Sequence, residues 1–140
     1  MDGAPADLVA LGGLCYADDD WAGAREHWEA AFRGYRQAGD KRAAARVAAH
    51  LAELHHAALG NHAAGRGWVN RADRLLADEG PCVERGYVLL AYIACEAADL
   101  EELAQRADDA LAIAVEFNDP NLEVRALADG GYALVAQGRT

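Results

Sequence analysis

The chain has little positive charge. It carries 13 Lys and Arg residues against 23 Asp and Glu residues, which gives a formal net charge of −10. Nucleic-acid binding depends on the neutralisation of phosphates by Lys and Arg, and an anionic membrane surface would also repel such a chain. We therefore expect neither a nucleic acid nor a membrane among its direct partners.

Long apolar runs and paired cysteines are also missing. No stretch approaches the roughly 18 apolar residues of a membrane-spanning helix, and the amino terminus lacks the charged and apolar regions of a signal peptide. The three cysteines, Cys15, Cys82 and Cys95, fit no CxxC spacing, and any one disulfide would leave a third thiol unpaired. We expect Cys15 and Cys95 to be reduced core residues of a soluble, cytoplasmic protein.

No run of alternating β-branched residues occurs, so no strand is expected. Apolar residues instead recur at three- and four-residue spacing, as at Leu8, Leu11 and Cys15, which predicts amphipathic helices. We expect an all-α fold of about seven helices in one domain, 1–140. Because the connections are short, sequential helices should be antiparallel neighbours.

A turn recurs about every 40 residues, which is typical of stacked helical hairpins. It appears as Asp19-Asp20-Trp21, Gly60-Asn61-His62, Ala98-Asp99-Leu100 and Gly138-Arg139-Thr140. A doublet in the first helix of each pair keeps the same period, as Leu11-Gly12, Leu51-Ala52, Leu90-Ala91 and Gly130-Gly131. Small residues at matched positions let helix backbones approach closely. The predicted repeats are about 5–38, 40–78 and 82–117, followed by a half-repeat at 121–137.

These features resemble the tetratricopeptide repeat, whose usual unit is about 34 residues. The longer unit is similar to the extended repeats of actinobacterial regulators of the LuxR type and of cyclase-linked relatives. The residues that carry this resemblance are Trp28, Glu29, Tyr35, Arg36, Ala38-Gly39-Asp40, Ala45-Arg46-Val47-Ala48, Leu51-Ala52, His55, Gly60, Gly67-Trp68, Arg71-Ala72, Arg74-Leu75-Leu76, Asp119-Pro120 and Leu134-Val135-Ala136-Gln137-Gly138-Arg139.

The resemblance implies a right-handed superhelix and a regulatory setting. Those regulators join such a region to a helix-turn-helix output domain, and this sequence contains no helix-turn-helix segment. A role in transcription would therefore act through another protein. The sequence also stops where a further second helix would begin, so either a longer protein has been trimmed or a short form ends in an unpaired helix.

In a solenoid of helical hairpins, the first helix of each pair builds the concave wall. Three arginines share one repeat position there, and guanidinium groups pair well with carboxylates of a peptide. The alternative is that each arginine pairs with a local acid, namely Glu84, Glu123, Glu53 or Glu96. The residues expected to line this groove are Val9, Tyr16, Arg46, Glu53, His56, Arg85, Tyr92, Glu96, Arg125, Tyr132 and Val135.

A cluster of His50, His55, His56, His62 and Glu53 is the densest group of titratable residues. It contains no HExxH pattern, and few of its members share a helix face, so we expect no metal site. Glu53 and His56 could act as an acid–base pair, but no nucleophile or oxyanion hole accompanies them. We expect a non-enzymatic protein without a cofactor.

The last helix should present an exposed apolar surface. Its apolar residues include Leu127, Leu134 and Val135, and repeat arrays normally end in a polar helix. We predict self-association or a docked partner there, for example a homodimer through the carboxyl-terminal helix.

The predicted function is a scaffold that binds a protein or peptide in its concave groove. The alternative is a small-molecule sensor or a minor biosynthetic enzyme that uses the same groove. Tyr16, Tyr92 and Tyr132, together with Glu53 and His56, would favour that alternative, because aromatic walls with convergent polar groups suit small ligands.

Overall fold

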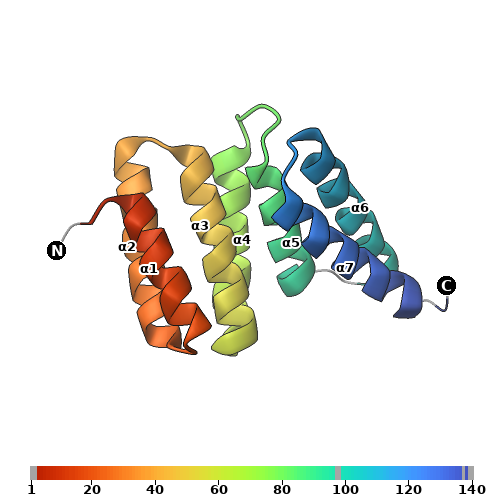
Figure 1. Ribbon diagram of the computed structural model, residues 1–140, viewed down its shortest axis with the longest axis horizontal. Helices are drawn as coiled ribbons and strands as arrows, with labels where there is room; N and C mark the ends of the chain where they lie inside the picture. Colours follow the sequence, from red (N-terminus) through yellow and green to blue (C-terminus); the bar gives the residue numbers. More distant parts are fainter. Residues whose placement is uncertain (1–2, 97–98, 137, 139–140) are drawn as a thin grey trace.

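Helices form nearly all of the described chain. The computed structural model describes residues 3–96, 99–136 and 138. These residues form no strand, and the prediction of an all-α fold with about seven helices is confirmed for them. The elements, shown in Figure 1, are α1 (Pro5–Ala17), α2 (Trp21–Ala38), α3 (Lys41–Glu53), the π-helical turn η1 (Leu54–Ala58), α4 (His62–Leu76), α5 (Glu84–Glu96), α6 (Leu100–Glu116) and α7 (Pro120–Ala136).

Short polar side chains fix where four helices begin. Asp20, Asp40, Asn61 and Asp99 each precede a helix and accept a hydrogen bond from a backbone N–H of its first turn. Such caps satisfy donors that have no partner within the helix. Gly39 ends α2 with a φ of +77°, a conformation that glycine adopts without strain. Asp20, Asn61 and Asp99 belong to three of the recurring turns, which are thus helix boundaries set by side-chain capping.

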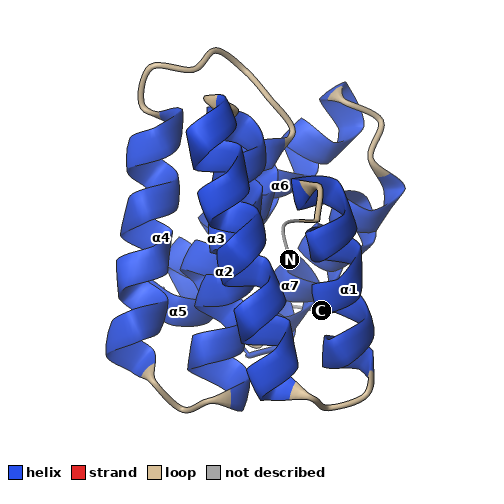
Figure 2. Ribbon diagram, turned by 90° about the vertical axis from the view of Figure 1, so that its left-hand side faces the viewer, coloured by secondary structure: helices blue, strands red, loops and turns tan. Residues whose placement is uncertain are grey.

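Consecutive helices pack against one another along a single row. α1 packs on α2, α3 on α4 and α6 on α7, while α2 with α3 and α5 with α6 join these pairs. α3 also packs directly against α5. The first and last helices therefore lie at opposite ends of the row in Figure 1, and Figure 2 looks along the row from the end formed by α1 and α2.

Helix α5 takes part in two apolar cores. Its Val88 and Ala91 belong to the larger core, which α2, α3 and α4 complete around Trp28, Leu51 and Trp68. The smaller core contains Tyr87, Leu90, Ala110, Ala114, Leu122 and Ala126, from α5, α6 and α7. Because neighbouring faces of α5 are buried in different cores, this helix links the two halves of the row.

Small residues sit where helices cross closely. A methyl group built on Gly12 would lie 2.3 Å from Nε1 of Trp28, and one built on Gly86 would lie 2.3 Å from Cδ2 of Leu122. Ala52 and Ala91 of the recurring doublets are fully buried. These positions allow no larger side chain unless a neighbour moves.

The predicted third helix differs from the observed one near its end. The observed helix α3 ends at Glu53 and is followed directly by a π-helical turn, Leu54–Ala58, which sequence periodicity did not indicate. Within this turn, Nδ1 of His55 is buried without a hydrogen-bond partner. Of the recurring turns, Ala98, Arg139 and Thr140 lie outside the described residues, as does Gln137 at the end of the predicted half-repeat.

None of the described helices is both long and apolar enough to cross a lipid bilayer.

Candidate functional site

Two open hollows lie on the surface formed by α1, α3, α5 and α7, which we call the trough face. The first, of about 300 Å³, opens between α1 and α3 and is lined by Ala6, Val9, Tyr35, Ala43, Arg46, Val47, His50 and Glu84. The second, of about 260 Å³, opens between α3, α5 and α7 and is lined by Glu53, Leu90, Ile93, Ala94, Arg125, Ala128 and Asp129. The trough face therefore combines charged side chains with an apolar floor.

Arg46 lines the first hollow and is held by an aromatic ring. Its guanidinium carbon lies 3.9 Å from the ring centroid of Tyr87 on α5, a cation–π contact. The Tyr87 hydroxyl donates to the carboxylate of Asp119, with O–O distances of 3.0 and 3.1 Å, and Asn121 Nδ2 donates to the same hydroxyl oxygen. Burial raises the pKa of Tyr87. A continuous set of contacts thus runs from α3 through α5 to the start of α7.

Glu53 and Arg125 form an ion pair across the second hollow, from α3 to α7. Burial raises the pKa of Glu53, although Arg125 acts in the opposite direction. Asp129, one turn after Arg125, also has a raised pKa because of burial. Arg125 therefore faces two carboxyl groups, one of which is its direct partner.

His50 lies on α3 between Arg46 and Glu53. Its ring stacks on Trp28, with centroids 5.2 Å apart. Burial, together with the positive charges of Arg46 and Arg125, lowers the pKa of His50 from 6.5 to about 4. His50 is therefore neutral at physiological pH.

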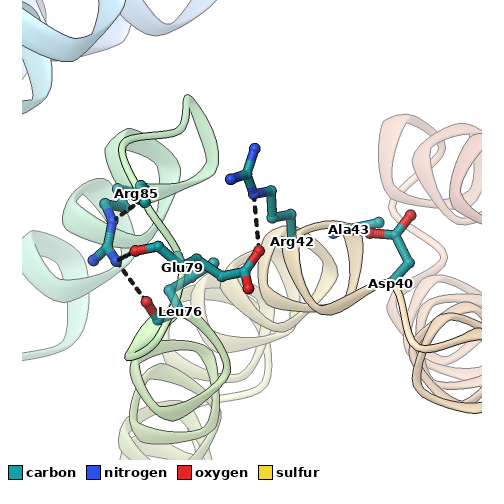
Figure 3. Close-up of polar contacts among 7 residues, drawn as sticks. Asp40, Arg42, Ala43, Leu76, Glu79 and Arg85 are labelled. Carbon is teal, nitrogen blue, oxygen red and sulfur yellow. Dashed lines mark hydrogen bonds and ion pairs between the residues drawn. The ribbon is translucent and has the colours of Figure 1, made fainter.

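Arg85 lies away from the trough face. Its guanidinium donates to the carbonyl oxygens of Leu76, Glu79 and Gly80 at the connection between α4 and α5. The Glu79 carboxylate accepts from Nε of Arg42 at 2.9 Å, so that α3 braces the same connection (Figure 3). The last carbonyl groups of a helix lack intrahelical partners and attract cations, which explains this position of Arg85.

Tyr92 also lies on the other side of α5. It lines a hollow of about 210 Å³ between α4, α5 and α6, together with Asp73, Leu76, Arg85, Val88, Leu89, Arg106 and Ile113. Its hydroxyl donates to Glu102, and the guanidinium of Arg106 lies 4.9 Å from its ring centroid. The structure therefore separates Arg85 and Tyr92 from Arg46, Glu53 and Arg125. The reason is that α5 is covered on two faces, so residues of one repeat position do not all point the same way.

The remaining predicted groove residues do not converge. Tyr16 packs against Trp21 at a centroid distance of 5.1 Å, and Tyr132 is 65% exposed on α7. His56 meets His62, with their Nδ1 atoms 2.8 Å apart, and does not pair with Glu53. Glu96 is partly exposed at the end of α5. An acid–base pair of Glu53 and His56 is thus not assembled, and the three predicted tyrosines form no common wall.

Exposed apolar side chains follow the outer surface of α7. Leu127, Leu134 and Val135 are 54%, 46% and 70% exposed, and Val124 is exposed beside them. Leu127 follows Val124 by three residues, Leu134 follows Leu127 by seven, and Val135 follows Val124 by eleven, so all four lie on one side of the helix. We call these four residues the α7 stripe.

Sequence patterns did not identify Tyr87, Asp119 or Asn121 as a connected group. The side chain of Asp119 accepts a hydrogen bond from the backbone N–H of Leu122 and so starts α7. An Asp followed by Pro at the first helical position is typical of a helix start. A buried tyrosine needs a hydrogen-bond partner, but the sequence does not say which one.

The described residues contain no group of three or more His, Cys, Asp or Glu side chains that could hold a metal ion. Comparisons with protein-family models, with curated proteins and with solved structures gave no match.

Proposed function

We propose that the chain is a non-enzymatic scaffold of tetratricopeptide type that binds a protein or peptide on its trough face, in a regulatory setting. The recurrence of about 40 residues supports a helical-hairpin array. The pairing of α1 with α2 and of α3 with α4 is consistent with such an array, and α6 packs on both α5 and α7.

The observation that carries the proposal is the series of charged groups between two open hollows. Arg46, Glu53, Arg125 and Asp129 line these hollows, which are about 300 and 260 Å³ in volume. An extended peptide that lies across both hollows would pair its carboxylate groups with the arginines and its ammonium groups with the acidic residues. Specificity would then come from placed charges, and affinity from the apolar floor.

The side-chain partners of Glu53 and His56 favour a binding role over a catalytic one. Glu53 pairs with Arg125, and His56 pairs with His62. Neither residue is positioned as an acid or base beside a nucleophile.

The test is selection from a displayed library of short peptides, followed by affinity measurements on the selected sequences. Asp129→Lys reverses a charge in the second hollow. It should reduce the affinity for the selected peptides by about tenfold, which corresponds to about 1.4 kcal/mol of binding free energy. The matched control is Asp108→Lys, the same charge reversal at an exposed position of α6. Equal affinities for the two variants would show that the peptides bind elsewhere.

The α7 stripe supports a second interaction, in which two copies of the chain associate through α7. Apolar surfaces of this kind mark interfaces more often than free surface. In sedimentation experiments at high concentration, the chain should form dimers that Leu127→Glu dissociates. Val115→Glu, at an exposed position of α6, should leave the dimer intact. A chain that stays monomeric at every concentration excludes this interaction.

A small organic ligand is the other candidate function. The hollow between α4, α5 and α6 favours it, because Asp73, Arg85 and Arg106 converge there on apolar side chains. A thermal-shift screen of metabolites tests this candidate. A stabilising compound whose effect is lost in Arg106→Gln would place the ligand in this hollow.

A further inference from the structure

A hollow of about 510 Å³ lies between α2, α4 and the start of α3, and of its lining residues only Lys41 comes from a helix of the trough face. It is lined by Phe32, Arg36, Lys41, Arg71, Arg74 and Leu75. Four of these six residues are cations, in a chain with 13 basic and 23 acidic residues. Positive charge is thus concentrated at this site, which we call the basic hollow.

The four cations have no anionic partner within the described chain. The ion pairs formed by described residues join Arg25 to Glu29, Arg42 to Glu79 and Arg125 to Glu53. The four side chains of the basic hollow are exposed, and no hydrogen bond joins them to a described residue. Like charges that gather without a counterion repel one another. Their grouping therefore does not stabilise the fold.

Helix dipoles explain only part of this arrangement. Arg36 and Arg74 lie in the last turns of α2 and α4, where a cation is favourable. Lys41 is the first residue of α3, at the end where the dipole disfavours a cation. Its neighbour Asp40 accepts a hydrogen bond from the backbone N–H of Ala43. The positions of Lys41 and Arg71 therefore need another explanation.

Aromatic rings orient two of the guanidinium groups. Phe32 and Trp68 meet edge to face with centroids 5.0 Å apart. The Arg36 guanidinium lies 5.9 Å from the Phe32 centroid, and the Arg71 guanidinium lies 4.3 Å from the Trp68 centroid. A stacked guanidinium keeps the N–H donors of its plane free for carboxylates. Two donor groups are thus held in place before any ligand binds, which reduces the entropy lost on binding.

We propose that the basic hollow binds an acidic peptide segment of a partner protein, in which carboxylate side chains flank a large apolar residue. The cations are spread over three helices, so they suit several carboxylates better than one small anion. Phe32 and Leu75 supply the apolar contact. A long polyanion such as duplex DNA is disfavoured by the net charge of −10, which repels it beyond the hollow. This site is separate from the trough face, and neither proposal depends on the other.

The probe is a fluorescein-labelled peptide in which glutamates flank a central tryptophan, and its anisotropy is measured with the full chain at low ionic strength. The comparison peptide has glutamine at every glutamate position. We expect the glutamate peptide to bind and the glutamine peptide to bind at least about tenfold more weakly. Affinity should also fall with added salt, since charge pairs at a surface are screened.

Two double variants with the same loss of charge locate the site. Arg36→Gln with Arg71→Gln should reduce affinity at least about tenfold. Arg33→Gln with Arg66→Gln changes exposed arginines of the same two helices outside the hollow, and should change affinity less than about twofold. Circular dichroism verifies that both doubles are folded. Lys41→Gln with Arg74→Gln is a further pair that should repeat the loss.

Three results would overturn the proposal. One is an equal loss of affinity in the hollow and control doubles, which would indicate a general effect of charge. Another is equal binding of the glutamate and glutamine peptides. The last is displacement of the glutamate peptide by inorganic phosphate or duplex DNA at concentrations below that of a competing unlabelled glutamate peptide.

Discussion

Acidification should destabilise the fold through His50. Burial, together with the positive charges of Arg46 and Arg125, lowers the pKa of His50 from 6.5 to about 4. The unfolded chain therefore takes up a proton near pH 6.5, whereas the folded chain takes it up only near pH 4. The stability contributed by neutral His50 is fully present above pH 6.5 and is lost as the pH falls from 6.5 toward 4.

The size of this effect follows from the difference between the two pKa values. Each unit of pKa difference corresponds to about 1.4 kcal/mol, so the loss of unfolding free energy should reach about 2 kcal/mol near pH 5. Burial raises the pKa values of Glu53 and Asp129, and these groups change stability in the opposite direction, since their protonation favours the folded state. A matched variant is needed to separate the two contributions.

The variant is His50→Gln, which removes the titrating group and keeps a polar side chain. Urea unfolding of both proteins near pH 8 measures the packing lost in the variant, because His50 is neutral there in both states. Between about pH 8 and pH 5, the wild-type chain should lose about 2 kcal/mol more than the variant. Equal losses would refute this reasoning, as would an NMR titration of the His50 ring with a midpoint near its ordinary value.

Three further substitutions test the packing and hydrogen bonds of the fold. Gly12→Ala should lower the free energy of unfolding in urea by about 1–2 kcal/mol. The new methyl group would overlap the buried Trp28 ring, and this cost outweighs the gain in helix propensity. Unchanged stability would mean that the ring moves freely. Arg85→Ala should lower the free energy of unfolding by about 2 kcal/mol, since three carbonyl oxygens lose a charged donor. Arg33→Ala, at an exposed position, should change the urea midpoint of unfolding little. Equal effects of the two variants would contradict the role assigned to Arg85. Tyr87→Phe removes the hydroxyl that joins α5 to the start of α7 and should lower the melting temperature by a few degrees, corresponding to about 1 kcal/mol; a higher melting temperature would show that this hydroxyl does not stabilise the fold.

Helix positions could be predicted well from sequence because they depend on local chemistry. Four helix starts are marked by capping side chains, at Asp20, Asp40, Asn61 and Asp99. Each accepts a hydrogen bond from the backbone N–H three residues later, so a few consecutive residues determine where the helix begins. The three- and four-residue spacing of apolar residues then marks the buried face. The π-helical turn at Leu54–Ala58 was not predicted, because periodicity does not distinguish it from an α-helix.

The candidate site could be predicted only in part. Repeat position suggested that Arg46, Arg85 and Arg125 share one environment, yet they contact Tyr87, the end of α4 and Glu53, respectively. The partner of a long, flexible arginine is chosen by whichever acceptors neighbouring helices bring within reach. The basic hollow was missed for a similar reason, since the packing of α2 and α4 brings Arg36 and Lys41 beside Arg71 and Arg74 of a later segment.

The sequence by itself determined that the described chain is helical, where most of its helices start and end, and that its net charge is −10. These properties follow from capping, periodicity and composition, which act over a few residues or over the whole chain. Only the tertiary structure decided that α5 takes part in two cores and that Arg85 braces a connection. It also decided that four cations gather between α2, α4 and the start of α3. The physical reason is that these features depend on the angle and rotation with which helices pack, and many side chains distant in sequence fix that geometry together.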